Sequence, residues 1–142
     1  MSPERRGEVE WLLGRAAGWA ATRDDIVAVA LVGSWARGAA GPDSDIDVVV
    51  LTDDPAAYLE RDDWVEELAP GARLVRTGDW IAIVERRLRL ASGLEVEVGI
   101  GRPSWAGISP VDPGTQRVVR DGMRPLYDPR GVLATLGSAA EG

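Results

Sequence analysis

Residues 26–50 read IVAVALVGSWARGAAGPDSDIDVVV, and this stretch decides the fold. It opens with an apolar run over residues 26–32, whose β-branched side chains predict a buried strand. We expect a short turn or the start of a helix at residues 35–38, followed by a loop at the breakers of residues 41–43. A second apolar strand then begins at Ser44. The stretch is thus expected to resemble a β-α-β unit at the centre of the domain.

Two carboxylates open the second of these strands. Asp45 and Asp47 are two positions apart, so they point to the same face, while Ile46 and Val48 point into the core. Carboxylates held side by side on a rigid strand repel each other, which is costly unless a cation lies between them. Oxygen-only ligands favour Mg²⁺ or Mn²⁺ over zinc. The pair therefore predicts a divalent metal site.

The same residues carry a resemblance to a known family. Gly33-Ser34, the following residues 36–38, and then Asp45 and Asp47 resemble the signature of the nucleotidyltransferase superfamily related to DNA polymerase β. More narrowly, they resemble the minimal nucleotidyltransferases of prokaryotes. The resemblance implies that Gly33 and Ser34 hold the triphosphate of a nucleotide. It also implies that the two aspartates bind metal ions and that a later strand supplies a third acid.

Three polar residues near this signature each have two interpretations. Ser34 fits the N-cap of a helix, a role that agrees with phosphate binding because backbone N–H groups point outward there. Arg37 could fork onto phosphate oxygens or pair with a surface acid. Ser44 could contact phosphate or simply end the turn. Trp35 follows Ser34 directly and is a candidate for stacking on a base, whereas the other tryptophans are expected to pack in the core or at its rim.

A hairpin supplies the candidates for the third acid. Residues 91–93 read ASG, a three-residue loop between a strand from Trp80 to about residue 90 and a return strand over residues 94–100. In the register that this loop implies, Arg89 faces Glu95 and Arg87 faces Glu97. Both glutamates therefore also fit ordinary cross-strand charge pairs.

The choice between the two glutamates depends on strand geometry. If the return strand lies antiparallel beside the Asp45 strand, its C-terminal end meets the end that carries the aspartates. Glu97 would then be the closer residue, so we predict Glu97 as the third acid and keep Glu95 as the alternative. Relatives more often have an aspartate at this position.

Composition narrows the classes of function. The chain has 142 residues, a net charge of −7, no cysteine and no histidine, and all sixteen basic residues are arginine. Cysteine chemistry is excluded, and acid–base chemistry is left to carboxylates or the substrate. The acidic balance gives no strong nucleic-acid signal. No apolar segment approaches membrane-spanning length and no signal peptide is evident, so we expect a cytoplasmic protein without membrane contact.

The chain is expected to form one domain over residues 1–142. It would comprise an N-terminal helix (1–23), a catalytic core (26–100) and a C-terminal extension (101–136), with residues 137–142 frayed. The predicted class is α/β (α+β), a small mixed and largely antiparallel sheet with helices packed on one face, which is nucleotidyltransferase-like. One or two short helices are expected over residues 56–68, and a short edge strand over residues 123–127.

The predicted function follows from the resemblance. It is Mg²⁺- or Mn²⁺-dependent transfer of a nucleoside monophosphate from an NTP, with ATP expected, to a hydroxyl group of a small molecule or a partner protein. Asp45, Asp47 and Glu97 would hold the metal and carry catalysis, and Gly33, Ser34, Arg37 and Ser44 would bind the nucleotide. The alternative is a weak or inactive nucleotide-binding module, similar to the antitoxin partners of helical HEPN proteins. Larger members of the superfamily hold the acceptor with an extra domain, for which this short chain has no room. The missing wall of the acceptor site would therefore come from residues 101–136, a second copy or a partner.

Overall fold

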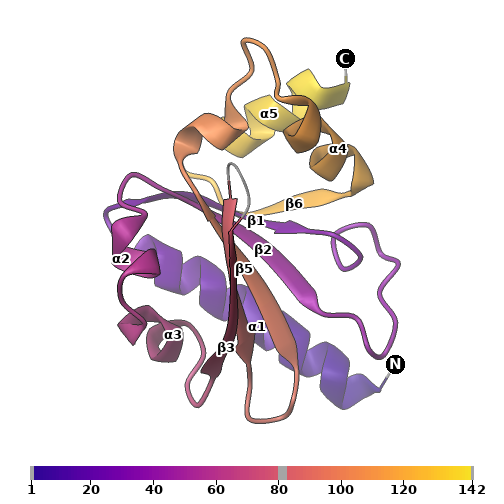
Figure 1. Ribbon diagram of the computed structural model, residues 1–142. Coiled ribbons are helices and arrows are strands. Elements are labelled where there is room, and N and C mark those ends of the chain that lie inside the picture. The colour runs from indigo at the N-terminus through magenta and orange to yellow at the C-terminus, as the bar shows by residue number, and fades with distance from the viewer. Residues whose placement is uncertain (1, 80–82, 142) are drawn as a thin grey trace.

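The computed structural model describes residues 2–79 and 83–141 (Figure 1). The elements are, in order, α1 (Pro3–Ala21), β1 (Ile26–Val32), β2 (Ile46–Thr52), α2 (Ala56–Leu59), α3 (Asp63–Leu68), β3 (Arg73–Asp79), β4 (Ile83–Arg89), β5 (Glu95–Gly101), the 3₁₀-helix η1 (Pro103–Ala106), α4 (Pro113–Asp121), β6 (Met123–Tyr127) and α5 (Val132–Glu141). None of the described helices is long and apolar enough to cross a membrane.

The strands form one six-stranded sheet in the order β3-β4-β5-β2-β1-β6. Every neighbouring pair is antiparallel except β2 and β5, which run parallel. The predicted class, a mixed and largely antiparallel sheet with helices, is confirmed. The expected β-α-β unit is wrong, because β1 and β2 pair antiparallel through a loop.

Helix α1 forms as its sequence predicts. The Ser2 hydroxyl accepts a hydrogen bond from the Arg5 N–H at 3.1 Å, and Pro3 occupies the first helical turn. Its buried side chains are Val9, Leu12, Leu13, Ala16, Trp19 and Ala20. Trp19 packs with Tyr58 and Trp64 of α2 and α3, at ring-centroid distances of 5.9 and 6.1 Å. This aromatic cluster joins α1 to α2 and α3.

The two faces of the sheet carry different helices. One core cluster contains Leu12 of α1, Trp64 of α3 and inward residues of the strands, such as Leu31. A second cluster contains Trp105 of η1 and Leu133 of α5, packed on the other side of β1 and β2. In Figure 1, α4 and α5 lie together, apart from α1, α2 and α3. The structure thus adds a second helical layer, over part of the opposite face, that the sequence does not predict.

The β4–β5 hairpin has the predicted register. Arg89 is paired with Glu95, and Arg87 with Glu97, around the loop at residues 91–93. β3 extends to Asp79. The predicted start of the next strand at Trp80 lies outside the described residues.

The C-terminal end differs from the prediction. Residues 137–141 are helical rather than frayed, because α5 continues to Glu141. Ala140 is fully buried, and its carbonyl accepts hydrogen bonds from Gln116 Nε2 at 3.2 Å and Arg120 Nε at 3.1 Å. These contacts from α4 fix the last turn of α5. The expected edge strand at residues 123–127 is confirmed as β6.

Candidate active site

The parallel pairing of β2 and β5 brings two carboxylates together. Asp47 of β2 lies opposite Val32 of β1 on one side and Glu97 of β5 on the other. The antiparallel arrangement assumed for β5 is wrong, yet Glu97 is the neighbour of Asp47, and Glu95 lies one pleat earlier. The predicted neighbour of β2 is thus right and only the strand direction differs.

Arg87 lies at the centre of the acidic side chains. Its guanidinium contacts Asp45 Oδ2 at 2.7 Å, Glu95 Oε1 at 3.0 Å and Glu97 Oε2 at 2.7 Å. Glu95 is also bound by Arg89, with N–O distances of 2.8 and 2.9 Å. These two guanidiniums hold the pKa of Glu95 below its usual value. Glu95 is therefore saturated by arginine, which argues against it as a free acid.

The pKa values of Asp47 and Glu97 are raised, whereas that of Glu95 is lowered. Burial and the neighbouring Asp45 carboxylate raise the pKa of Asp47 to about 6. A hydrogen bond with the Glu85 carboxyl, together with burial, raises the pKa of Glu97 to about 7, although Arg87 opposes that shift. Asp47 makes no salt bridge within residues 2–79 and 83–141. The site thus holds more negative charge than its arginines neutralise.

Gly33 allows the turn after β1 to pass close to Asp47. Its φ is +75°, and a Cβ atom there would lie 2.6 Å from Asp47 Oδ2. Residues 34–38 form successive turns, with hydrogen bonds from Ala36 N and Arg37 N to the Gly33 carbonyl. Of the two expected alternatives for residues 35–38, a short turn or the start of a helix, the structure has the turn. Ser34 is half-buried in a turn, and no helix N-terminus accompanies its hydroxyl.

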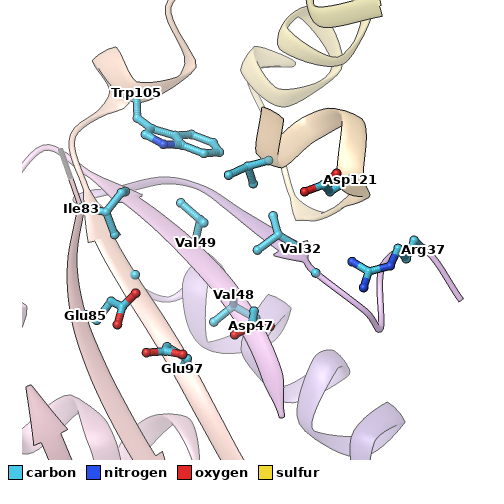
Figure 2. A pocket seen from close by; sticks show the side chains of 13 residues that line it. Val32, Arg37, Asp47, Val48, Val49, Ile83, Glu85, Glu97, Trp105 and Asp121 are labelled. Carbon is cyan, nitrogen blue, oxygen red and sulfur yellow. The ribbon is translucent and has the colours of Figure 1, made fainter. Parts of the chain in front are cut away.

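The other predicted nucleotide-binding residues differ in their surroundings. Arg37 is exposed and extends toward the cavity (Figure 2), with no salt bridge in the described part of the chain. The Ser44 hydroxyl accepts a hydrogen bond from Gly41 N at 2.8 Å, and its carbonyl accepts one from Trp35 Nε1 at 3.3 Å. Ser44 and Trp35 therefore hold the loop between β1 and β2, and Trp35 packs against the core.

These elements enclose a cavity of about 320 Å³. Figure 2 shows Asp47, Glu97 and Glu85 toward one end of it and Trp105 at the other. The lining residues are Val32, Gly33, Arg37, Asp47, Val48, Val49, Ile83, Glu85, Glu97, Gly99, Trp105, Val118 and Asp121. Residues 101–136 thus contribute one wall of this cavity, which is one of the three sources expected from the sequence. Glu85 and Asp121 were missed; alternation along β4 could have indicated Glu85, but Asp121 carries no local signal.

The donor chemistry of the site fits a hard divalent cation. Asp47, Glu85 and Glu97 offer only oxygen donors. Burial raises the pKa of Asp47, and a hydrogen bond with Glu85 raises that of Glu97. No group of three or more acidic, histidine or cysteine side chains in the described ranges is arranged around one metal position. The reason is visible in the geometry, because Asp45 and Glu97 are turned toward Arg87.

Comparisons with known proteins agree with this fold. Residues 19–94 match the family model of the nucleotidyltransferase domain, a range that contains Asp45 and Asp47 and ends before Glu95. The solved structure of a cytoplasmic RNA terminal U-transferase superposes with a TM-score of 0.55 at 20% identity, covering 84% of this chain and 33% of that one. The chain therefore spans about a third of that protein's length, and the likeness is one of fold. No protein of the curated set matches by sequence. The match over more than half of its residues shows that the chain belongs to the nucleotidyltransferase family.

Proposed function

We propose that this chain transfers a nucleoside monophosphate from an NTP, with ATP the expected donor, to the hydroxyl group of a small acceptor. The observation that carries the proposal is the pairing of Asp47 with Glu97 across β2 and β5, beside a glycine turn and at one end of the cavity. The donor is bound at the turn and the acceptor in the cavity.

The residues have separate roles in this proposal. The turn after Gly33 admits the triphosphate, and the Ser34 hydroxyl and the Arg37 guanidinium bind its oxygens. Asp45, Asp47 and Glu97 form the acidic set that holds Mg²⁺ or Mn²⁺. When bound, the ion neutralises phosphate charge and lowers the pKa of the acceptor hydroxyl. Ser44 acts indirectly, by holding the loop.

Glu97 is suited to receive the acceptor proton. It lies at the acidic end of the cavity, next to Glu85. An acceptor in the cavity would place its hydroxyl at this end and its apolar part against Trp105, Val118 and Ile83. A volume of about 320 Å³ favours a small molecule over a polypeptide or a nucleic-acid strand.

The test is Mg²⁺-dependent pyrophosphate release from each NTP, with a panel of small alcohols and amino alcohols. Asp47→Asn is expected to abolish release, and Asp53→Asn, which lies just beyond the other end of β2 and is exposed, is expected to leave it intact. Equal release from both variants would contradict the proposal.

A second candidate is a nucleotide-binding module without transfer activity, working with a helical protein partner. One observation favours it: Arg87 already engages Asp45 and Glu97. This candidate predicts Mg²⁺-dependent NTP binding without pyrophosphate release under any acceptor.

A further inference from the structure

The end of α4 lies directly against the turn that follows β1. β6 begins at Met123, which pairs with Val32, the last residue of β1. Gly122 therefore lies beside the start of the turn, and the residue before it, Asp121, lines the cavity together with Arg37 (Figure 2). Two segments that are far apart in the chain thus meet beside the candidate site.

Gly122 has no side chain at the point where these segments approach most closely. A Cβ atom there would lie 2.9 Å from Arg37 Cβ, 3.0 Å from Arg37 N and 3.3 Å from Arg37 Cα. Two of these three atoms belong to the main chain, which cannot rotate away as the end of a side chain can. Arg37 N also donates a hydrogen bond to the Gly33 carbonyl at 3.2 Å. A side chain at residue 122 would therefore displace Arg37 and, through this hydrogen bond, the glycine that lies against Asp47.

The role of Gly122 in ending a helix does not explain this contact. Its φ is +136° and its N–H donates to the Val119 carbonyl at 3.1 Å, as expected for a glycine at the C-terminal end of a helix. Gly131 also has a positive φ, of +71°, yet nothing lies within 4 Å of a Cβ atom built there. The close approach to Arg37 is therefore a separate property of Gly122.

We propose that Gly122 is a positioning residue of the nucleotide site: without a side chain, it lets the end of α4 hold the turn in the shape that presents Ser34 and Arg37 to the triphosphate. This inference rests on the proposed function in taking the turn as the place where the nucleotide binds. Gly122 acts through Arg37 and touches no reacting atom. It lies outside residues 19–94, which match the family model, so this support comes from the C-terminal part of the chain.

The experiment measures, by calorimetry, the affinity of the wild-type chain and two variants for the Mg²⁺-NTP that the wild-type chain binds most tightly. Gly122→Ala is expected to bind it about tenfold more weakly, because main-chain atoms of the turn must shift. Gly131→Ala is the matched control, since it adds the same methyl group at another glycine of positive φ without a clash, and its affinity is expected to be unchanged. Circular dichroism at the titration temperature verifies that both variants are folded.

Nuclear magnetic resonance tests the same contact in the wild-type chain, which covers the case in which Gly122→Ala does not fold. The amide signal of Gly122 is expected to shift on addition of Mg²⁺-NTP with the same Kd as that of Gly33, whereas the signal of Gly131 stays in place. Equal affinity of the two variants, or an unmoved Gly122 signal, would overturn the inference.

These outcomes separate the inference from the proposed function. If Ser34→Ala and Arg37→Ala weaken NTP binding but Gly122→Ala does not, the nucleotide site stands and only the role of Gly122 fails. If the wild-type chain binds no Mg²⁺-NTP, the proposed function fails and this inference fails with it.

Discussion

At the scale of single residues, Asp47 links stability to pH. Its pKa in the folded protein is about 6, above the ordinary value of 3.8, so the folded state binds more protons than the unfolded state between these values. The stability of the folded state therefore falls as pH rises through this window, and the penalty persists above it. Asp47→Asn removes the penalty and is expected to stabilise the metal-free protein by about 1–2 kcal/mol at pH 8, discounted for partial exposure.

This gain is expected to vanish only well below the ordinary pKa of 3.8, at about pH 3, where the wild-type carboxyl is largely protonated in both states. Urea unfolding at the two pH values measures it, with Asp53→Asn as the control. A loss of stability in Asp47→Asn at pH 8 would show that the carboxylate supports the fold.

Substitutions of Glu97 and Glu95 are expected to have different effects on turnover. Glu97→Gln keeps size and polarity but cannot take a proton, so it is expected to lower kcat at least tenfold, about 1.4 kcal/mol of barrier, with NTP affinity nearly unchanged. Glu95→Gln is the control, because Glu95 is occupied by Arg87 and Arg89. If Glu95→Gln rather than Glu97→Gln lowers kcat, then Glu95 is the third acid and Glu97 is not.

Ser34 is expected to contribute to NTP binding through its hydroxyl. Ser34→Ala should weaken Mg²⁺-NTP binding by roughly 1.5–3 kcal/mol, the usual range for a hydrogen bond to a charged group. Calorimetry measures the change, and Ser138→Ala on the exposed side of α5 is the control. Equal NTP affinity in Ser34→Ala and the control would remove the hydroxyl from the phosphate site.

At the scale of elements, Gly99 fixes how closely β5 approaches its neighbour. A Cβ atom there would lie 2.8 Å from Ile83 Cγ2, on a β-branched side chain that cannot easily turn away. Gly99→Ala is expected to destabilise the protein by about 1–3 kcal/mol. Gly18→Ala is the contrasting change, because Gly18 lies exposed in α1 with nothing within 4 Å. It should stabilise the protein by about 0.5–1 kcal/mol, and thermal unfolding of both variants tests the pair.

The elements also show what a sequence can predict. The α1 helix and the β4–β5 register follow from local periodicity and from the loop at residues 91–93, and both agree with the structure. The parallel pairing of β2 with β5 does not follow, because it joins distant segments whose apolar patterns fit either direction. The helical end at Ala140 is set by α4, which no pattern within residues 137–142 reveals.

The candidate site is likewise predictable from the sequence only in part. Gly33, Asp45 and Asp47 lie in one segment, so their spacing alone indicates a site. The three-way contact of Arg87 depends on Asp45, which is far away in the chain, and hairpin register predicts only its pair with Glu97. Asp121 reaches the cavity only through the packing of α4.

At the scale of the whole molecule, a bound cation is expected to stabilise the fold. Any ligand that binds only the folded state adds stability, about 2.7 kcal/mol at a hundredfold excess over its Kd. Mg²⁺ should therefore raise the unfolding temperature of the wild-type chain and of Asp53→Asn but not of Asp47→Asn. An equal rise in all three would indicate binding elsewhere on this acidic chain.

The parallel contact between β2 and β5 has a consequence for the order of folding. Asp47 and Glu97 meet only after the chain closes a loop over residues 53–94, whereas the β1–β2 and β4–β5 pairs close over shorter loops. Contacts between distant segments form slowly, because the entropy of loop closure precedes their gain. We therefore expect the two halves of the candidate site to form separately and to join late, with their like charges repelling each other in that last step. The candidate site would then lie at the contact that forms last.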